Sequence, residues 1–569
     1  CEEWFETIGR VINGLFRIKK KHYDENKIDW DNEKETKFAE KMYDLMFNAK
    51  FLCGGRGLWA MGSRITDEKY IYAAVSSCAG IDTNNPDDPS QPFEFLFDAC
   101  MLGVGVGFTA KTTNIKLYMP KDEIKKHIIA DSREGWVQAL RELLRSYFIE
   151  NSCTIEFDYS KIRPAGELLK VFVGTSSGPE PLKKSFDQIK NLIVNNIKAG
   201  KNILDSRLIV DIMNVMCVCV ISGNVRRSAT LSLGNLEDEE FINLKDYDIN
   251  HERASYGWMS NNSIDAKIGM NYKQIELRNC KLGEPGLLWM SNARKYSRMG
   301  VHAIEDNKDE KAVLTNPCGE ITLHNGELCN LVEVFINRHE SLEDFLNTLK
   351  YAFTYGKIVS LTKTFWEVTN KVIEKNRRVG VSLTGIANFI EDHGIEALHQ
   401  WCEKGYDFIK NYDKELSKEL MINESIKVTT CKPSGSISLL VPNTTPGIHY
   451  PLSKYYIRRV RINVNQKNLM ESMRSKGYNI VKSETEPNTL IVEFPIYSGC
   501  KRDATEMTMW EQFEITAKLQ EWWSDNQVSC TIYFDPDREA HDIAHCLDLY
   551  QYRLKGISFL PVYKNFVNV

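Results

Sequence analysis

The segment TNPCGEI at residues 315–321 restricts the fold of this chain more than any other stretch. Pro317 fixes its own φ and drives Asn316 toward an extended conformation, so a helix is disfavoured here. Side chains alternate along an extended segment, which places Asn316, Cys318 and Glu320 on one face. The prediction is a short loop or finger that presents an amide, a thiol and a carboxylate in one small site.

A turn that happens to carry a buried cysteine would explain NPCG equally well. The next thiol, Cys329, lies eleven residues after Cys318. A hairpin would bring Cys329 back toward Cys318, and this favours a functional interpretation over the simple turn.

Composition limits the class of protein that can surround this finger. The 569 residues provide one large domain or about three or four ordinary ones. With 43% apolar and 26% charged residues the chain is expected to be globular, and its net charge of -5 disfavours a nucleic-acid polymer as partner. It contains no apolar run long enough for a membrane span and no signal-peptide pattern, which predicts a cytoplasmic protein. Because it begins at Cys1, we expect a fragment or a processed chain.

Fifteen cysteines are too sparse for a disulfide scaffold and fit a reducing cytosol. The close pair Cys217 and Cys219 could suggest zinc, but residues 204–220 have apolar side chains at helical spacing behind a possible N-cap at Asp205. Residues two apart on a helix do not face each other, so both are interpreted as buried thiols. No metal site is predicted.

The order of the remaining segments predicts a mixed α/β fold. Apolar side chains at helical spacing make the N-terminal part helical, and the helix at 204–220 is followed by a strand at 229–233. Such alternation argues for an α/β sheet or barrel. The spacing of GVGVG at 103–107 is wrong for a dinucleotide fingerprint and indicates close packing or the approach of a substrate instead. Residues 259–264 are expected to form a polar loop.

The loop KPSGSIS at 432–438 can offer backbone N–H groups and hydroxyls to an anion. It is not a Walker A loop, because the Gly-Lys-Ser/Thr order is absent.

Taken together in this order, eight segments resemble the ribonucleotide reductases, most closely the adenosylcobalamin-dependent (class II) kind and especially the monomeric ribonucleoside-triphosphate reductases. The resemblance covers nearly the whole chain. The segments are GRGLW at 55–59, REGWV at 133–137, IRP at 162–164, GNVRR at 223–227, SNNSI at 260–264, NPCGE at 316–320, LCNL at 328–331 and YYIRRVRI at 455–462.

The resemblance implies a ten-stranded α/β barrel made of two parallel five-strand halves, with the finger loop at its centre. It implies a helical N-terminal region at 1–70 and a barrel domain at 71–569, with an effector-type region around 110–200.

Carried over by resemblance, Cys318 is the thiol that becomes a thiyl radical and abstracts the 3′-hydrogen of the ribose. Glu320 is the base for the 3′-hydroxyl proton, and Asn316 holds the ribose hydroxyls. Cys78 and Cys329 are the redox pair that releases the 2′-hydroxyl as water and ends as a disulfide. The residue types suit these roles, since a carboxylate can act as general base and one dithiol supplies two electrons.

The same resemblance implies that Arg163 belongs to a region that senses a deoxynucleotide effector. It also implies a ribonucleoside triphosphate as substrate, thioredoxin or another dithiol as reductant, and a monomer or homodimer. The expected substrate-binding residues are Ser77, Lys432, Pro433, Ser434, Gly435, Ser436, Ile437 and Ser438.

Three radical sources distinguish the classes of this family. The only adjacent tyrosines, Tyr455 and Tyr456, are not at the C-terminus as a class I catalytic subunit requires, and Gly556 lacks a glycyl-radical context. Adenosylcobalamin is therefore the expected cofactor. There are two alternatives to a cobalamin-dependent reductase: a class I-type catalytic subunit that needs a metal-radical partner, and a non-catalytic nucleotide-binding protein on the same barrel. The family's C-terminal cysteine pair has no counterpart after Cys546, so we expect that the tail was removed or that re-reduction differs.

Overall fold

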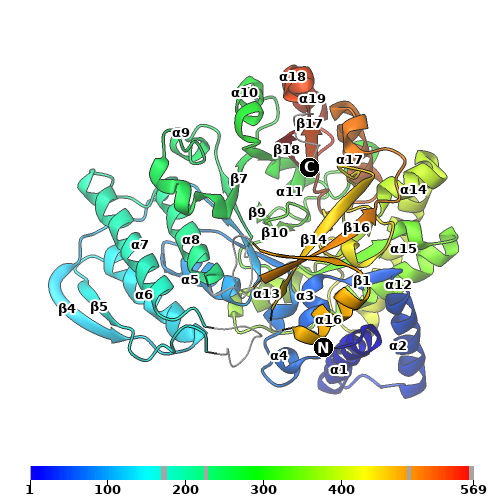
Figure 1. The fold of residues 1–569 in the computed structure, drawn as a ribbon, viewed down its shortest axis with the longest axis horizontal. Coiled ribbons are helices and arrows are strands. Elements are labelled where there is room, and N and C mark those ends of the chain that lie inside the picture. Colours follow the sequence, from blue (N-terminus) through cyan, green and yellow to red (C-terminus); the bar gives the residue numbers. More distant parts are fainter. Residues whose placement is uncertain (1, 168–175, 223–228, 465, 484–488, 563–569) are drawn as a thin grey trace.

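Two curved sheets surround a short hairpin near the centre of the molecule (Figure 1). The computed structural model describes residues 2–167, 176–222, 229–464, 466–483 and 489–562. The hairpin consists of β9 (Leu314–Thr315) and β10 (Thr322–Leu323), which are antiparallel. Its tip is the predicted finger, residues 316–321.

The larger sheet has seven strands in the order β17-β18-β8-β7-β6-β3-β2. Neighbouring strands are parallel except β8 and β18, which are antiparallel. The strands are β2 (Cys78–Ile81), β3 (Gly105–Thr109), β6 (Thr230–Gly234), β7 (Ser260–Asp265), β8 (Gly286–Leu288), β17 (Thr531–Phe534) and β18 (Gly556–Pro561).

The smaller sheet has the order β1-β11-β12-β13, with β1 (Phe51–Cys53) antiparallel to β11 (Leu331–Phe335). Strands β12 (Gly380–Thr384) and β13 (Thr429–Thr430) continue it in parallel. Single bridges, Ala79 to Leu328 and Cys431 to Val528, link the two sheets. The predicted α/β fold with a central finger is confirmed, although the described strands divide into four and seven and not into two parallel halves of five.

The hairpin lies against the larger sheet because glycines clear its path. A Cβ atom at Gly107 in β3 would lie 2.0 Å from the carbonyl oxygen of Thr315, and one at Gly80 in β2 would lie 3.0 Å from Leu314. No side chain fits at Gly107. The interpretation of GVGVG as a site of close packing is thereby confirmed.

Helices cover the outer faces of both sheets. The helical N-terminal region is confirmed as α1 (Trp4–Asn26) and α2 (Asn32–Phe47). Helix α5 (Gln91–Met101) packs on β2 and β3, and α12 (Leu342–Val359) packs on β1 and β11. The other helices include α3 (Gly55–Ala60), α4 (Arg64–Asp67), α9 (Glu239–Ile242), α10 (Lys273–Leu282), α11 (Met290–Lys295), α13 (Glu367–Asn376), α14 (Ile386–His393), α15 (Ile395–Glu419), α16 (Lys467–Ser475), α17 (Met509–Trp522), α18 (Pro536–Glu539) and α19 (Ile543–Tyr550).

Helix α8 (Ser206–Ile221) forms where its sequence pattern predicts. The side chain of Asp205 accepts a hydrogen bond from Leu208 N at 2.8 Å, as expected of an N-cap. Cys217 and Cys219 are both buried, which confirms that they are core thiols. Within the described ranges, no three His, Cys, Asp or Glu side chains gather as metal ligands would.

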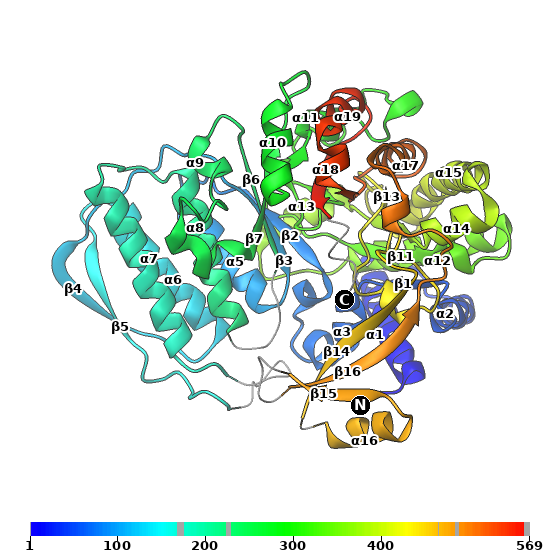
Figure 2. The ribbon, with the colours of Figure 1, turned by 45° about the horizontal axis from the view of Figure 1, so that its top comes forward.

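Two smaller units flank the sheets (Figure 2). Strands β4 (Lys121–Ile128) and β5 (Cys153–Asp158) form a separate parallel pair, accompanied by α6 (Arg133–Phe148) and α7 (Glu180–Lys198). Strands β14 (Tyr455–Asn463), β16 (Thr489–Tyr497) and β15 (Asn479–Lys482) form an exposed antiparallel sheet.

The prediction of a polar loop at 259–264 is wrong, because these residues form β7 inside the larger sheet. The polar side chains of this strand bond to one another and to neighbouring elements. Asn262 Oδ1 accepts from Ser232 and Ser260, and Ser260 Oγ accepts from Asn214 in α8. Polar residues can occupy a buried strand when their hydrogen bonds are satisfied. Residues 223–227 of the expected motif set lie outside the described part of the chain.

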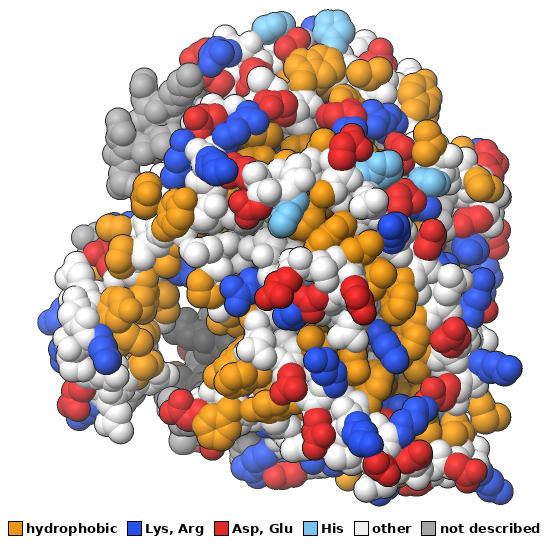
Figure 3. Space-filling view, turned by 90° about the vertical axis from the view of Figure 1, so that its right-hand side faces the viewer, with side chains coloured by type: hydrophobic (Ala, Val, Ile, Leu, Met, Phe, Trp, Pro, Cys, Tyr) orange, Lys and Arg blue, Asp and Glu red, His pale blue; other side chains and the backbone are white. Residues whose placement is uncertain are grey.

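Acidic and basic side chains alternate over the face shown in Figure 3, with apolar side chains between them and no extended field of one sign. None of the helices in the described ranges has both the length and the apolar character of a membrane span.

Candidate active site

The finger tip is held by the side chain of Asn316. Its Oδ1 accepts from the backbone N–H groups of Glu320 at 3.1 Å and Ile321 at 3.0 Å, and Gly319 adopts φ +77° at the turn. Asn316 is fully buried, and its Nδ2 has no hydrogen-bond partner among the described residues. The amide therefore shapes the tip through Oδ1, and the Asn316 side chain also interacts with the carboxyl group of Glu320, whose pKa it lowers.

Cys78 and Cys329 face each other across a backbone bridge. Ala79 pairs with Leu328 in antiparallel register, and Cys329 N donates to Cys78 O at 2.8 Å. This register places residue 78 directly opposite residue 329, where Cα atoms lie about 4.5–5.5 Å apart. That separation suits a disulfide. Both cysteines are buried in one apolar cluster with Ile321 and Leu323 of the finger.

The thiol of Cys318 completes a group of three sulfur atoms. Its interaction with the Cys78 thiol, together with the protein packed around the sulfur atom, raises the pKa of Cys318 well above its usual range, although the residue as a whole is exposed. The hydrogen bond from Cys318 favours the thiolate of Cys78, but Cys329 and burial outweigh it and raise the pKa of Cys78. Both groups therefore remain S–H at neutral pH, the form that can give or exchange a hydrogen atom.

Glu320 is fully buried beside these thiols. Burial raises the pKa of Glu320, and the positive charge of Lys432 opposes the shift. Glu320 Oε2 has no hydrogen-bond partner within the described residues. A buried carboxylate with a raised pKa and a free oxygen is suited to act as a general base.

The finger tip also borders an open cavity of about 490 Å³, whose lining includes neither Cys78 nor Cys329 nor Glu320. Cys318 is the exposed residue of the three cysteines and contributes to the cavity wall together with Pro317 and Gly319. The rest of the wall comes from residues of β6, β7, β8, β17 and β18, from the segments 282–284 and 527–530, and from Pro433. Cys318 therefore lies between a closed group of thiols and an accessible space.

The loop at 432–438 lies near the finger, but its lysine is already paired. Lys432 Nζ lies 2.5 Å from Glu333 Oε1, and Glu333 also accepts from Ser434 and from Thr384. Ser438 N donates to Ser434 Oγ at 3.2 Å. Lys432 and Ser434 thus brace the loop through Glu333.

The exposed part of this loop is Gly435 and Ser436. A Cβ atom at Gly55 would lie 3.9 Å from Ser436 Oγ, and one at Gly54 would lie 3.1 Å from Ser77 Oγ. The glycine pair thus lies between the two hydroxyls. Ile437 is buried, and Pro433 lines the cavity beside Cys318.

Arg163 lies far from this centre in the flanking β4–β5 unit. Its Nε donates to both oxygens of Asp131, at 2.8 and 3.1 Å. The described structure thus shows a carboxylate partner for Arg163, and its effector role stays a prediction.

Comparison with known proteins identifies the family. Residues 1–63 match the family model "Ribonucleotide reductase alpha domain", and residues 104–193 match "B12-dependent ribonucleotide reductase, insertion domain". The chain is 46% identical to a probable adenosylcobalamin-dependent ribonucleoside-triphosphate reductase of Dictyostelium discoideum, over 98% of this chain and 76% of that protein. It belongs to the adenosylcobalamin-dependent (class II) ribonucleotide reductases.

Further relatives of this class II ribonucleotide reductase support the same family assignment. The adenosylcobalamin-dependent ribonucleoside-triphosphate reductase of Euglena gracilis is 45% identical over 99% of this chain and 77% of its own length. A crystal structure of a B-12 dependent (class II) ribonucleotide reductase matches with a TM-score of 0.88 and 27% identity, covering 99% of this chain and 88% of the other. A class Id alpha subunit of Actinobacillus ureae, at 13% identity and a TM-score of 0.57, shares the fold.

Sequence reasoning missed residues that support the finger of this class II ribonucleotide reductase. Ser529 Oγ donates to the carbonyl of Cys318 at 2.5 Å, and Thr430 Oγ1 donates to the carbonyl of Glu320 at 2.6 Å. Gln527 N donates to the same Glu320 carbonyl at 3.1 Å. These residues lie more than 100 positions from their partners. A single sequence contains no signal for contacts at that separation.

Proposed function

We propose that this chain reduces ribonucleoside triphosphates to 2′-deoxyribonucleotides with adenosylcobalamin as cofactor. The observation that carries the proposal is the position of Cys318, which touches the Cys78 thiol on one side and opens to a cavity on the other. A thiol that must receive a radical from a cofactor and pass it to a sugar needs both contacts.

The cavity suits the adenosyl group of the cofactor. Its volume of about 490 Å³ falls within the range of roughly 300–1,000 Å³ for small-molecule sites. Two of its lining residues carry buried acceptor oxygens, Glu284 Oε2 and Gln527 Oε1, that have no partner among the described residues. A nucleoside brings hydroxyl and amino donors. Glu284 and Gln527 would hold the adenosyl group, and the bound cofactor would supply the radical chemistry for which Cys318 gives up its hydrogen atom.

On the side of the finger that faces Cys78 and Cys329, which we call the closed side, the residues of the finger act on the ribose. Cys318 abstracts the 3′-hydrogen, and Glu320 accepts the proton of the 3′-hydroxyl. Asn316 Nδ2, which lacks a protein partner, donates to a ribose hydroxyl. The buried surroundings strengthen each of these hydrogen bonds relative to water.

Cys78 and Cys329 supply the two electrons of the reduction. One thiol protonates the 2′-hydroxyl, which leaves as water, and the hydrogen of the other thiol ends on C2′ as the pair closes to a disulfide and its two electrons pass to the sugar. Glu320 returns the proton to the 3′-oxygen. Cys318 then returns its hydrogen atom to C3′. Thioredoxin or another dithiol reopens the disulfide and restores both thiols.

The substrate phosphates bind at the exposed part of the 432–438 loop. Ser436 and the backbone N–H groups of Gly435 and Ser436 provide the donors, with Ser77 nearby. Lys432 contributes to phosphate binding by bracing the loop through its ion pair with Glu333, and not as a free cation that contacts the phosphates. Arg163 lies in the region proposed to sense a deoxynucleotide effector, and the protein acts in the cytoplasm as a monomer or homodimer.

The test is a reconstitution with purified protein, adenosylcobalamin, a dithiol and each ribonucleoside triphosphate in turn. Formation of deoxyribonucleotide without a second protein supports the proposal. Activity that requires a metal-containing partner would favour a class I-type subunit. Nucleotide binding without cleavage of the cobalt–carbon bond would favour a non-catalytic binding protein.

A further inference from the structure

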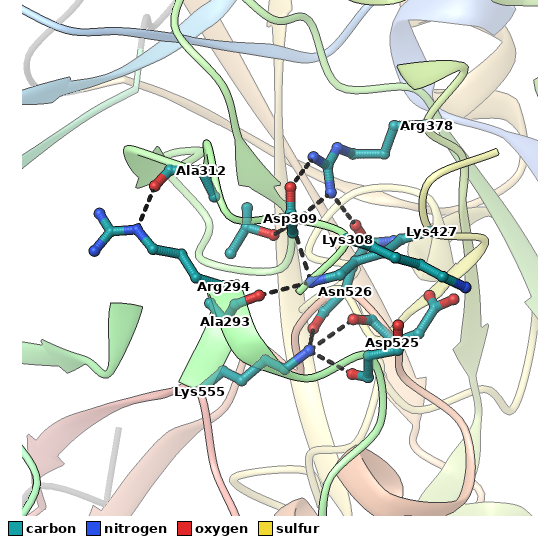
Figure 4. A network of polar contacts seen from close by, with 12 residues as sticks. Ala293, Arg294, Lys308, Asp309, Ala312, Arg378, Lys427, Asp525, Asn526 and Lys555 are labelled. Atoms are coloured by element: carbon teal, nitrogen blue, oxygen red, sulfur yellow. Dashed lines mark hydrogen bonds and ion pairs between the residues drawn. The ribbon is translucent and has the colours of Figure 1, made fainter. Parts of the chain in front are cut away.

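A single buried guanidinium, that of Arg378, joins three segments that are far apart in the sequence. Figure 4 shows Arg378 beside two of its partners, Asp309 and Asn526. Arg378 lies just before β12, and its side chain is 2% exposed. Its partners are Asp309, which precedes the finger hairpin, Glu327, which follows it, and Asn526. Each of the three segments carries one part of the active site.

All five N–H groups of Arg378 are used. Nη2 and Nη1 donate to the two oxygens of Asp309 at 2.6 and 2.9 Å. Nε and Nη2 donate to the two oxygens of Glu327 at 3.1 and 3.3 Å, and Nη1 also donates to Asn526 Oδ1 at 3.1 Å. The planar guanidinium fixes these donors in one plane, and a lysine ammonium cannot reproduce that geometry.

The Asp309 contact holds the stem of the finger. Asp309 also accepts from Thr322 Oγ1 at 2.7 Å and lies 2.9 Å from His324 Nε2 and 3.0 Å from Lys427 Nζ. Thr322 and His324 follow the tip, so these bonds tie the two ends of the hairpin together. The position of Cys318 at the tip therefore depends on Asp309.

The Glu327 contact holds the second thiol. Glu327 O accepts from Gly80 N at 3.0 Å, and two residues later Cys329 N donates to Cys78 O. Asn526 precedes Gln527, whose N–H holds the Glu320 carbonyl, and Ser529, which holds the Cys318 carbonyl. Arg378 is thus connected by short segments to the radical thiol, the redox pair and the base.

The cluster is built of charges that balance one another. Burial would raise the pKa of Asp309, but Arg378 and Lys427 hold it well below its usual range, so Asp309 remains ionised. Lys555 adds a second buried amino group beside that of Lys427, and it donates to the carbonyls of Ser297, Asp525 and Asn526. Lys555 thereby fixes the same Asn526 backbone that Arg378 reaches through the side chain.

We propose that Arg378 is a positioning residue that sets the distance between Cys318 and the pair Cys78–Cys329. It touches no substrate and no reacting atom. By holding Asp309 and Glu327 on one rigid plane, it keeps Cys329 opposite Cys78 and keeps Cys318 from replacing Cys329 as the disulfide partner.

The first test needs neither cofactor nor substrate. Mild oxidation with diamide, which accepts two electrons and two protons as two thiols become a disulfide, traps the cysteine pairs that lie in contact. Peptide mass spectrometry then gives the ratio of the Cys78–Cys318 to the Cys78–Cys329 disulfide. In the parent protein Cys78–Cys329 should dominate. In Arg378→Lys the ratio of Cys78–Cys318 to Cys78–Cys329 disulfide should rise by about tenfold or more. Lysine cannot make the bidentate contacts to Asp309 and Glu327, so the segments before and after the finger can move independently.

Arg253→Lys is the matched control. Arg253 is also fully buried and donates to Asp211 at 2.7 Å, but it contacts helix α8 and not the finger. Its disulfide ratio should equal that of the parent protein. If Arg378→Lys does not fold, Glu327→Gln takes its place in the test, because glutamine keeps the shape of one partner of Arg378. The thermal unfolding transition shows whether each variant is folded. An unchanged ratio in folded Arg378→Lys or Glu327→Gln overturns the proposal, as does an equal rise in Arg253→Lys.

A second readout rests on the proposed function. With adenosylcobalamin and a ribonucleoside triphosphate, Arg378→Lys should still cleave the cobalt–carbon bond but form about 100-fold less deoxyribonucleotide per cleavage, since misplacement of reacting groups by about 1 Å costs that much. Equal losses in cobalt–carbon cleavage and in deoxyribonucleotide formation would contradict a positioning role for Arg378. If the parent protein shows no cobalt–carbon cleavage at all, the proposed function fails while the disulfide test still decides the role of Arg378.

Discussion

The two sides of the finger tip differ in how they are built. On one side, Cys78 and Cys329 are buried and fixed by backbone bonds between β2 and the segment before β11, and the buried Glu320 is held at its carbonyl by Thr430 and Gln527. On the other side, Cys318 opens to a cavity whose walls are strands and loops. In the proposed mechanism the radical is delivered from the open side and used on the closed side, where competing reactions with water are excluded.

Only Cys318 belongs to both sides of the finger tip, so Cys318→Ser should have the largest effect on deoxyribonucleotide formation. A hydroxyl O–H does not exchange a hydrogen atom as readily as a thiol, and deoxyribonucleotide formation should fall to background. Cobalt–carbon cleavage should disappear with it, while the thermal transition stays within the small range expected of an isosteric change. Retained turnover would remove Cys318 from the mechanism.

Cys329→Ser should break the closed side alone. The variant lacks one of the two electron donors, so multiple turnover should stop while nucleotide-dependent cobalt–carbon cleavage persists. The measurement compares the rate of cofactor cleavage with the yield of deoxyribonucleotide. Cys280→Ser, at a half-buried thiol outside the site, is the control. Loss of cleavage in Cys329→Ser would show that the two sides are not separable.

Leu560→Trp should affect the open side alone. Leu560 lines the cavity and is 45% exposed, so a larger side chain narrows the space without disturbing the core. We expect about tenfold weaker binding of adenosylcobalamin, which corresponds to about 1.4 kcal/mol. Diamide should still form the Cys78–Cys329 disulfide. Leu549→Trp, at an exposed position outside the cavity wall, should change neither quantity.

The smallest effect is expected in the pH dependence of the closed side. Glu320 can act as base only when ionised, and its pKa is raised by burial, so single-turnover reduction should decline as the pH falls through that raised value. Lys432 opposes this shift, so Lys432→Gln should raise the pKa of Glu320 further. The acid limb of the pH profile should therefore move to higher pH. An unmoved limb would indicate that Glu320 does not limit the reaction.

Local patterns in the sequence predicted the parts of the fold that local chemistry controls. The N-cap at Asp205 and the close approach at Gly107 follow from backbone preferences that act over a few residues. Pro317 correctly excluded a helix, but the finger tip is a turn, with Gly319 N donating to Asn316 O at 2.9 Å, and not the extended segment that the sequence predicts. The polar strand at Ser260–Asp265 was missed, because its hydrogen-bond partners come from other elements.

The sequence by itself determined which chemical groups are present at the finger and that the finger cannot be a helix. Its resemblance to a known family supplied the expected roles of the cysteines. Only the tertiary structure decided that Lys432 is paired with Glu333 and that Arg378 joins Asp309, Glu327 and Asn526. These contacts link residues from about 50 to nearly 150 positions apart. Folding brings such residues together through the packing of whole sheets, which no local pattern encodes.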